Sequence, residues 1–305
     1  MSVTKTVLII GGSGFIGTHL ALKLRDNYKV FATYHKHPLK IQGVTFLPFN
    51  VDNRNWSKRI MYMSQPDVVI YAIGNNSYDW AESHPRFSER LHSAGPAIVA
   101  NSADILQPRF IFLSNPYVFD GTRGNYHEND IVFPNCVLGR TKLGGENIVK
   151  SKCLNYLVLR SSPVIGRSNG INHSLLDTLR MKLDRNQQIE VATQELHSFV
   201  SVDGFTEVVR RLIETGIRNK IVHYGGLTKM TPFEFAKAFA TRFKYNPNLI
   251  LPKMNMYTHR QSGLAEDFLY DFSVNSTQTS ETLKIKPLLL EESFDLIEKQ
   301  LVTTS

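Results

Sequence analysis

Short apolar runs alternate with segments of helical periodicity through the first two-thirds of the chain. In each run the apolar and β-branched residues are nearly consecutive, which is typical of strands buried on both faces of a parallel sheet. The predicted strands are Val7–Ile10, Lys29–Tyr34, Val44–Phe49, Asp67–Ile73, Phe110–Ser114 and Leu157–Leu159. The predicted helices between them are Phe15–Leu24, 86–106 and 138–151. This order predicts an α/β fold in which helices cover a doubly wound parallel sheet.

The pattern changes after Arg160. Thr231-Pro-Phe-Glu234 is a capping box with proline at the first helical position, and it predicts a helix that ends near Phe243. Further helices are predicted at 173–185, 203–217 and Leu290–Leu301, with short strands at 188–192 and 221–224. We therefore expect a core over residues 1–160 and a smaller C-terminal lobe over 161–305, some segments of which return to the core.

A glycine-rich turn, Gly11-Gly-Ser-Gly14-Phe-Ile-Gly17, directly follows the first predicted strand and opens the first predicted helix. Glycine at these positions permits a tight turn, a close backbone approach to a pyrophosphate, and close packing of the helix on the strand. The unpaired N–H groups at the start of that helix would face the phosphates. The turn therefore predicts a dinucleotide site in a Rossmann-type core.

The end of the second predicted strand indicates which dinucleotide is bound. An acidic residue here usually binds the adenosine ribose hydroxyl, but this strand ends Tyr34-His35-Lys36-His37. A basic cluster suits a 2′-phosphate and favours NADP over NAD. The alternative is a solvated turn whose charges contact no ligand.

Charge and composition narrow the class of protein. The 305 residues carry a net charge of +8, which is compatible with nucleotide ligands but is spread too thinly to predict nucleic-acid binding. Cys136 and Cys153 are too few for a disulfide framework or a four-cysteine zinc site, and the histidines lack paired ligand spacing, so we expect no metal. No apolar segment approaches the roughly 18 residues that span a bilayer. We expect a cytoplasmic protein without a membrane partner.

The motifs together resemble one known family. In order they are GGSGFIG at 11–17, PDVVIYA at 66–72, LSNPYVFDG at 113–121, GNYHEND at 124–130, LGRTKLGGE at 138–146, LRSSPVIG at 159–166 and FVSVDGF at 199–205. They are similar to those of the extended short-chain dehydrogenase/reductases, a family of nucleotide-sugar epimerases, dehydratases and reductases. The chain looks most like the dTDP-4-dehydrorhamnose reductase branch, which also contains the non-catalytic regulatory beta subunit of methionine adenosyltransferase.

The resemblance implies NAD(P) in the core, a nucleotide-linked sugar beneath the lobe, and a homodimer that pairs the helices 86–106 and Leu138–Lys150. The implied cofactor-binding residues are Gly11, Ser13, Gly14, Phe15, Ile16, Gly17, Tyr34, His35, Lys36, Asn50, Val51, Ala72, Ile73, Gly74, Lys142 and Val164.

The catalytic residues of the family are only partly present. They are a Ser or Thr, a Tyr four residues before a Lys, and a supporting Asn. The resemblance places the lysine at Lys142 and the tyrosine at Leu138, which cannot transfer a proton. The hydroxyl residue falls on Asn115, with Ser114 before it, and the asparagine falls on His92. The candidate catalytic residues are therefore Lys142, Ser114 and Asn115.

Two functions remain open at this stage. The first is an NAD(P)-dependent oxidoreductase or epimerase that acts on a nucleotide sugar with a replacement acid. His92 could titrate near neutrality and serve as that acid, although a lone histidine on a helix is more often structural. The second is a non-catalytic subunit that binds the cofactor and a protein partner. Family membership favours the first function, whereas the altered residues favour the second. On balance the sequence favours the enzyme, with the non-catalytic subunit as the alternative.

Overall fold

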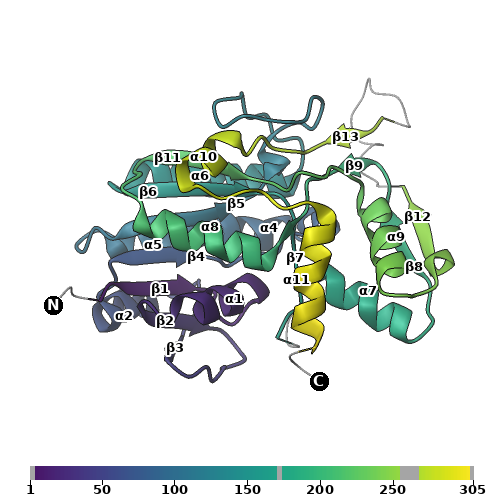
Figure 1. The fold of residues 1–305 in the computed structure, drawn as a ribbon. Coiled ribbons are helices and arrows are strands. Elements are labelled where there is room, and N and C mark those ends of the chain that lie inside the picture. The colour runs from purple at the N-terminus through teal and green to yellow at the C-terminus, as the bar shows by residue number, and fades with distance from the viewer. Residues whose placement is uncertain (1–3, 170–173, 255–267, 303–305) are drawn as a thin grey trace. The chain divides into compact units, whose positions relative to one another are not determined.

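The computed structural model describes residues 4–169, 174–254 and 268–302 (Figure 1). The chain divides into two compact units. Unit 1 comprises Met1–Val118, Phe133–Arg160 and Thr206–Val222, and unit 2 comprises Phe119–Val132, Ser161–Phe205 and His223–Ser305. This division differs from the expected boundary, because Phe119–Val132 groups with unit 2 although it precedes residue 160.

Within the described residues, unit 1 is built on a seven-stranded sheet. Its strands are β1 (Thr6–Ile10), β2 (Lys29–Tyr34), β3 (Val44–Pro48), β4 (Val68–Tyr71), β5 (Arg109–Ser114), β6 (Tyr156–Ser161) and β11 (Lys220–Tyr224). Their order is β11-β6-β5-β4-β1-β2-β3, and the pairs from β6 to β3 are parallel. The strand order reverses between β1 and β4, which is where doubly wound sheets bind ligands. The predicted doubly wound parallel sheet is confirmed.

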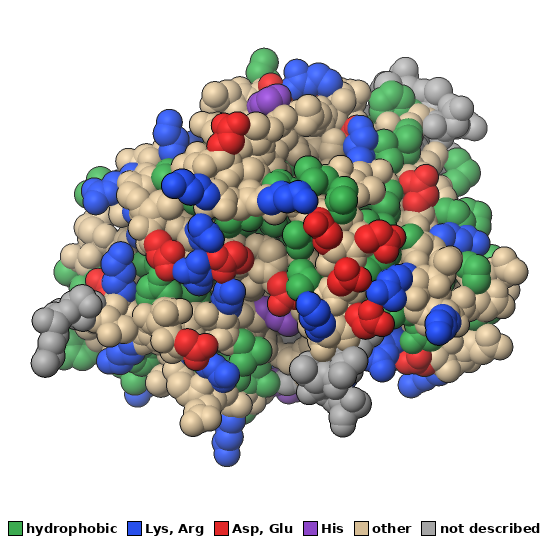
Figure 2. Space-filling view, viewed as in Figure 1, with side chains coloured by type: hydrophobic (Ala, Val, Ile, Leu, Met, Phe, Trp, Pro, Cys, Tyr) green, Lys and Arg blue, Asp and Glu red, His purple; other side chains and the backbone are tan. Residues whose placement is uncertain are grey.

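Helices cover both faces of this sheet. They are α1 (Phe15–Leu24), α2 (Arg54–Ser64), α3 (Tyr78–Ser83), α4 (Pro85–Glu89), α5 (Gly95–Ala103), α6 (Val137–Lys152) and α8 (Val202–Glu214). Figure 1 shows α1 and α8 on the near face, where Lys23 and Glu207 form an ion pair at 3.0 Å. Figure 2 shows acidic and basic side chains intermixed over α8. The net positive charge of the chain therefore does not form a continuous basic patch over this helix.

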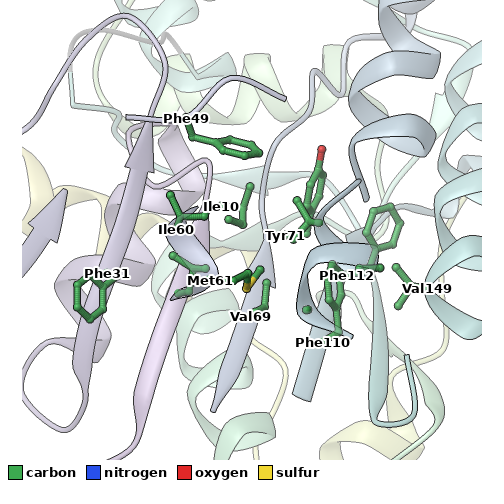
Figure 3. Close-up of a cluster of buried hydrophobic side chains, with 14 of the residues drawn as sticks. Ile10, Phe31, Phe49, Ile60, Met61, Val69, Tyr71, Phe110, Phe112 and Val149 are labelled. Carbon is green, nitrogen blue, oxygen red and sulfur yellow. The ribbon is translucent and has the colours of Figure 1, made fainter. Parts of the chain in front are cut away.

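The opposite face carries an apolar core cluster of unit 1 (Figure 3). Helices α2, α5 and α6 contribute Met61, Val99 and Val149 to this core, and they pack against Phe110 and Phe112 of β5. All five side chains are buried to 2% exposure or less. Burial of a large apolar side chain contributes roughly 1.5–3 kcal/mol, so this layer fixes the positions of α5 and α6 relative to the strand ends.

The single helix predicted over 86–106 is interrupted in the structure. A π-helical turn, Arg90–Ala94, separates α4 from α5. Pro96 has no N–H to continue an α-helical hydrogen-bond series, and the chain instead bonds the N–H of Gly95 to the carbonyl of Arg90. The Tyr71 hydroxyl donates to the carbonyl of Leu91 at 2.8 Å, which satisfies one oxygen of this irregular turn.

Helix α2 was not among the predicted elements. Its sequence does carry a helical signal that the prediction missed, because the buried residues Ser57, Ile60, Met61 and Ser64 follow spacings of three and four. The helix begins because the Asn53 side chain accepts hydrogen bonds from the N–H groups of Asn55 and Trp56. Ile60 and Met61 then bury on the core and hold it in place.

Unit 2 is smaller and mixed. Its helices are α7 (Leu175–Asp184), α9 (Pro232–Arg242), α10 (Thr277–Leu283) and α11 (Leu290–Val302). Short parallel strand pairs join β7 (Val164–Ile165) to β10 (Val200–Ser201), β8 (Ile189–Ala192) to β12 (Ile250–Lys253), and β9 (Glu195–Leu196) to β13 (Tyr270–Asp271). The predicted capping box of α9 is confirmed, with the N–H of Glu234 donating to Thr231 Oγ1 at 3.1 Å. The predicted start of α7, residue 173, lies outside the described residues.

Candidate functional site

The glycine turn connects β1 to α1 and has little room for side chains. Gly11 adopts a φ of +91°, a conformation that favours glycine. A Cβ on Gly11 would lie 2.9 Å from the backbone nitrogen of Ile73, and a Cβ on Gly17 would overlap the carbonyl oxygen of Gly11. Gly14 differs, because its nearest neighbour would be 3.3 Å away. Gly11 and Gly17 therefore shape the turn, whereas Gly14 leaves space above it.

The start of α1 is suited to an anion. Gly14 is the N-cap and has no side chain to cap the helix, and no acidic residue lies in the first turn. Phe15, Ile16 and Gly17 form that turn, and their N–H groups have no acceptor within the helix. The helix dipole adds a partial positive charge at this end. Ser13 lies in the turn itself, and its N–H donates to the carbonyl of Thr33 on β2 at 3.1 Å.

The carboxyl ends of neighbouring strands meet at this turn. The N–H of Ala72, just after β4, donates to the carbonyl of Ile10 at 2.8 Å. Ile73 packs against Gly11, and Gly74 follows it in an exposed position. Because parallel strands end at the same edge of a sheet, the structure places Ala72 and Ile73 beside the glycine turn.

The expected adenosine-side residues lie at the ends of β2 and β3. Tyr34 is half-buried, while His35, Lys36 and His37 are exposed. Tyr34 also lines an open hollow of about 490 Å³ beneath the connection that follows β2. Asn50 accepts a hydrogen bond from the N–H of Asp52 at 3.0 Å. Val51 packs against the helix layer, where its Cγ2 lies 2.5 Å from a Cβ built on Gly95.

Lys142 is the candidate catalytic lysine, and it lies on α6 in a buried position. Its Nζ donates to the carbonyl of Leu113 at 3.0 Å and lies 5.6 Å from the ring centre of Phe112. Burial lowers the pKa of Lys142 to about 8, although Glu146 one helical turn away opposes that shift. Lys142 is therefore mostly protonated near neutral pH, and it loses its proton more readily than an exposed lysine does.

Ser114 belongs to a buried ionic network and does not face an open site. Its hydroxyl donates to Glu146 Oε1 at 2.6 Å. Arg160 donates to both oxygens of the same carboxylate, at 2.9 Å from Nε and 2.7 Å from its terminal nitrogen. This network joins the ends of β5 and β6 to α6. The sequence did not single out Glu146 or Arg160, since a buried ion pair leaves no local spacing signal.

Leu138 and Asn115 occupy the positions of the family's tyrosine and hydroxyl residue. Leu138 is completely buried on the first turn of α6. The Asn115 side chain accepts a hydrogen bond from the N–H of Tyr117 at 3.1 Å and contacts Asn76 at 3.5 Å. Asn115 thus shapes the backbone after β5. Neither side chain can supply a proton.

His92 lies in the π-helical turn and is fully buried. Its Nδ1 lies 3.0 Å from Thr141 Oγ1, and that hydroxyl donates to the carbonyl of Leu138. Burial, and secondarily the positive charge of Lys142, lower the pKa of His92 to about 2. The expectation that His92 titrates near neutrality is wrong, and a neutral imidazole at this depth cannot act as the replacement acid.

The remaining candidate lies in unit 2. Val164 begins β7 and is half-buried there. Tyr126, which lies in one of the family-like motifs, donates to Asp120 at 2.5 Å and stacks on Phe119.

No group of three or more His, Cys, Asp or Glu residues in the described ranges could hold a metal ion. Of the helices that the structure describes, none combines the length and apolar character needed to cross a membrane.

Comparisons with known proteins connect these observations to a family. The RmlD substrate binding domain model matches residues 5–262. The methionine adenosyltransferase 2 subunit beta of Bos taurus is 26% identical over 255 residues, covering 81% of this chain and 75% of that protein. The dTDP-4-dehydrorhamnose reductase of Aggregatibacter actinomycetemcomitans is 29% identical over 222 residues, covering 72% of this chain and 71% of that protein.

Solved structures share the fold at lower identity. The dTDP-4-dehydrorhamnose reductase of Bacillus anthracis, in complex with NADP, superposes with a TM-score of 0.80 at 18% identity, covering 98% of this chain and 100% of that one. The UDP-glucose 4-epimerase of Thermotoga maritima, with UDP-glucose, superposes with a TM-score of 0.82 at 20% identity, covering 98% of this chain and 99% of that one.

Proposed function

The chain belongs to the family described by the RmlD substrate binding domain, and we propose that within it this protein is a cofactor-binding, non-catalytic subunit. It binds NADP in unit 1 and acts on a protein partner rather than on a nucleotide sugar. The observation that carries the proposal is Leu138, a fully buried aliphatic side chain at the position of the family's proton donor.

The residues of unit 1 fit a dinucleotide. A backbone cradle with no room for side chains at Gly11 and Gly17 lies beneath an uncapped helix start. Such a helix start binds phosphate groups through its N–H donors and its dipole. The Bacillus anthracis reductase, which shares the fold, is in complex with NADP, and this supports the assignment. When bound, the nicotinamide would supply a hydride acceptor or donor.

The choice of NADP rests on the end of β2. The exposed segment His35-Lys36-His37 offers a cation and no carboxylate. An acidic residue here would bind a free ribose hydroxyl and repel a 2′-phosphate. A charge-assisted contact from Lys36 instead favours the phosphorylated dinucleotide.

The surroundings of Lys142 support a non-catalytic role. Reduction of a ketone needs a proton donor near the hydride, and general acid catalysis is worth about 10²–10⁴-fold. Leu138 has no proton to give, His92 is neutral, and Asn115 bonds to the backbone. Lys142 can still contribute a positive charge to cofactor binding.

The partner is proposed from relatives. The Bos taurus protein is the beta subunit of methionine adenosyltransferase 2, and it is similar over most of the chain. We assign this protein the same kind of role, as a regulatory subunit of a larger enzyme. A homodimer through α5 and α6 is the alternative assembly, and sedimentation at micromolar concentration distinguishes a dimer from a monomer.

An alternative function is a nucleotide-sugar reductase or epimerase that uses an unconventional acid. The similarity to the Aggregatibacter reductase favours it, as does a lysine whose pKa of about 8 suits a site of proton exchange. The substrate would be a nucleotide-linked sugar such as a 4-keto dTDP sugar.

One experiment separates these functions. Calorimetry measures NADP and NAD binding, and NADPH absorbance is then followed after addition of dTDP- and UDP-linked sugars. We expect binding of NADP that is tighter than that of NAD, with no change in NADPH absorbance. Turnover at ordinary enzyme rates would overturn the non-catalytic assignment, and a lack of binding would overturn the cofactor assignment.

A further inference from the structure

Helix α2 presents an outer face of positive charge. Its cations are Arg54, Lys58 and Arg59, which are all exposed, and the helix contains no acidic residue. Among the residues that the structure describes, none pairs with these three side chains. Asp52, the acidic residue that precedes the helix, pairs instead with Arg90. The fold as described therefore leaves this cluster of charge without a counter-charge.

These cations do not stabilise the helix that carries them. Arg54 lies in the first turn, where the helix dipole is positive and a cation is unfavourable. Arg54 and Lys58 are four residues apart, so two like charges lie one above the other and repel. The helix is held instead by its Asn53 cap and by Ile60 and Met61, which lie in the buried cluster of Figure 3.

Large apolar side chains lie among the cations. Trp56 is 38% exposed, Tyr62 is 79% exposed and Met63 is 49% exposed. Tryptophan, tyrosine, methionine and arginine are the residues enriched where proteins bind one another. We call the exposed side of this helix the α2 face, and its residues are Arg54, Trp56, Lys58, Arg59, Tyr62 and Met63.

The spacing of the α2 face suits a second helix. Residues four apart on a helix form ridges, and the side chains of another helix can interdigitate with them. Two such ridges run side by side, Arg54–Lys58–Tyr62 and Asn55–Arg59–Met63. Arg54 and Lys58 are about 6 Å apart along the axis, and two carboxylates four residues apart on a partner helix have the same separation.

Other occupants fit this face less well. A second copy of the chain would bring the same cations against one another across a two-fold axis. Clusters that bind anionic lipids usually hold about four to eight cations, and the apolar side of α2 is already buried in unit 1. Three cations on one helix neutralise few phosphates of a nucleic acid. An acidic protein segment matches both the charge and the aromatic side chains.

We propose that the α2 face binds an acidic amphipathic helix of a protein partner. The carboxylates of that helix face the three cations, and its apolar side chains pack on Trp56 and Tyr62. This inference rests on the proposed function only in that a protein partner exists. It assigns the chemistry of that partner and the place where it binds, and it does not involve the cofactor site.

A model helix is the probe. It is a fluorescein-labelled peptide of about 20 residues, long enough for an isolated helix, with glutamates four apart and leucines on the same side. A second peptide carries glutamine in place of each glutamate. Fluorescence anisotropy measures the binding of both to the full chain. The test variant is Lys58→Gln with Arg59→Gln.

The matched control variant is Lys182→Gln with Lys220→Gln. It removes the same charge from two exposed lysines on α7 and β11. Tyr62→Ala tests the apolar part of the α2 face. NADP binding is measured for every variant by calorimetry, and the urea midpoint of unfolding is measured by circular dichroism.

We expect the Lys58 and Arg59 variant to bind the acidic peptide about 10- to 100-fold more weakly, because each lost contact accounts for about three- to tenfold. Tyr62→Ala should weaken binding about three- to tenfold, and the control variant should bind like wild type. The glutamine peptide should bind weakly to all forms. NADP affinity should not change, and the urea midpoint of the test variant should stay equal or rise, because repelling charges have been removed.

Other outcomes overturn the inference. Equal peptide binding by wild type and the test variant, or an equal loss in the control variant, would show that the α2 face is not the site. A lower urea midpoint would show that the cations serve the fold. Tighter binding of single-stranded RNA or of phosphatidylserine vesicles, lost in the test variant, would assign the face to a different class of partner. Failure of wild type to bind NADP would refute the proposed function and leave the peptide result standing.

Discussion

Replacement of Leu138 by tyrosine tests both the packing and the chemistry of the site. The leucine is completely buried, so the larger ring must displace its neighbours. Overpacking in a closed core costs about 1–3 kcal/mol, and a buried hydroxyl without a partner costs about 1–3 kcal/mol more. We therefore expect Leu138→Tyr to lower the free energy of unfolding by about 2–6 kcal/mol.

The phenylalanine variant is the matched control. Leu138→Phe adds almost the same volume without the hydroxyl, so its loss of stability should be confined to the overpacking part. Urea denaturation, followed by far-UV circular dichroism, measures both variants. The difference between them isolates the hydroxyl, and it should shrink if the new oxygen finds a partner near Lys142.

The same variant tests the missing acid. If the absence of a proton donor is what prevents turnover, Leu138→Tyr with Asn115→Thr should raise NADPH oxidation on a 4-keto nucleotide sugar by about 10²–10⁴-fold over any residual rate. A non-catalytic subunit that lacks a sugar site should show no turnover in either form while NADP binding persists. Unchanged stability of Leu138→Tyr would refute the closed packing described above, and equal turnover by Leu138→Phe would refute the role of the hydroxyl.

Four further changes have defined outcomes. Gly14→Val should keep the fold but weaken NADP binding in calorimetry by roughly 10- to 100-fold, because one charge-assisted phosphate contact is worth about 1.5–3 kcal/mol; unchanged affinity would misplace the pyrophosphate. Lys36→Glu should reverse the preference from NADP to NAD, and a retained NADP preference would exclude Lys36 as its source. Glu146→Gln should cost about 3–5 kcal/mol in chemical denaturation by leaving Arg160 unpaired, and a loss below 1 kcal/mol would contradict the buried ion pair. Relative to Lys142→Met, the wild-type free energy of unfolding should rise between pH 8 and 10.5, because the unfolded lysine keeps its proton there while the buried one, with a pKa of about 8, releases it; a flat difference would refute the lowered pKa.

The sequence by itself determined the parallel sheet and the glycine turn. Strands buried on both faces need nearly continuous apolar residues, and such runs are visible locally, so β1, β2 and β5 were predicted within a residue of their ends. The turn was equally clear from the spacing of its glycines. Gly17 is required by its contact with the nearby carbonyl of Gly11, whereas Gly11 is required by its positive φ and by contact with Ile73 of the neighbouring strand end. Capping boxes are local in the same way, and that of α9 was predicted residue by residue.

The tertiary structure alone decided the chemistry around Lys142. The sequence placed His92 on a helix, but the π-helical turn that positions it forms where Pro96 interrupts the hydrogen-bond series and Tyr71, from β4, satisfies Leu91. Its low pKa comes from burial and from Lys142, which is fifty residues away in sequence. Such an environment is set by contacts between distant segments, which no local pattern records.

Two other differences concern helices. Helix α2 has helical spacing of its buried positions that the prediction did not use, and Ile60 and Met61 pack in the core of unit 1. The chain returns to unit 1 at Thr206–Val222, where α8 buries Val208, Val209, Leu212 and Ile213. Local spacing identifies which residues can form a strand, a turn or a cap, whereas the protonation and pairing of a buried group depend on what the completed fold packs around it.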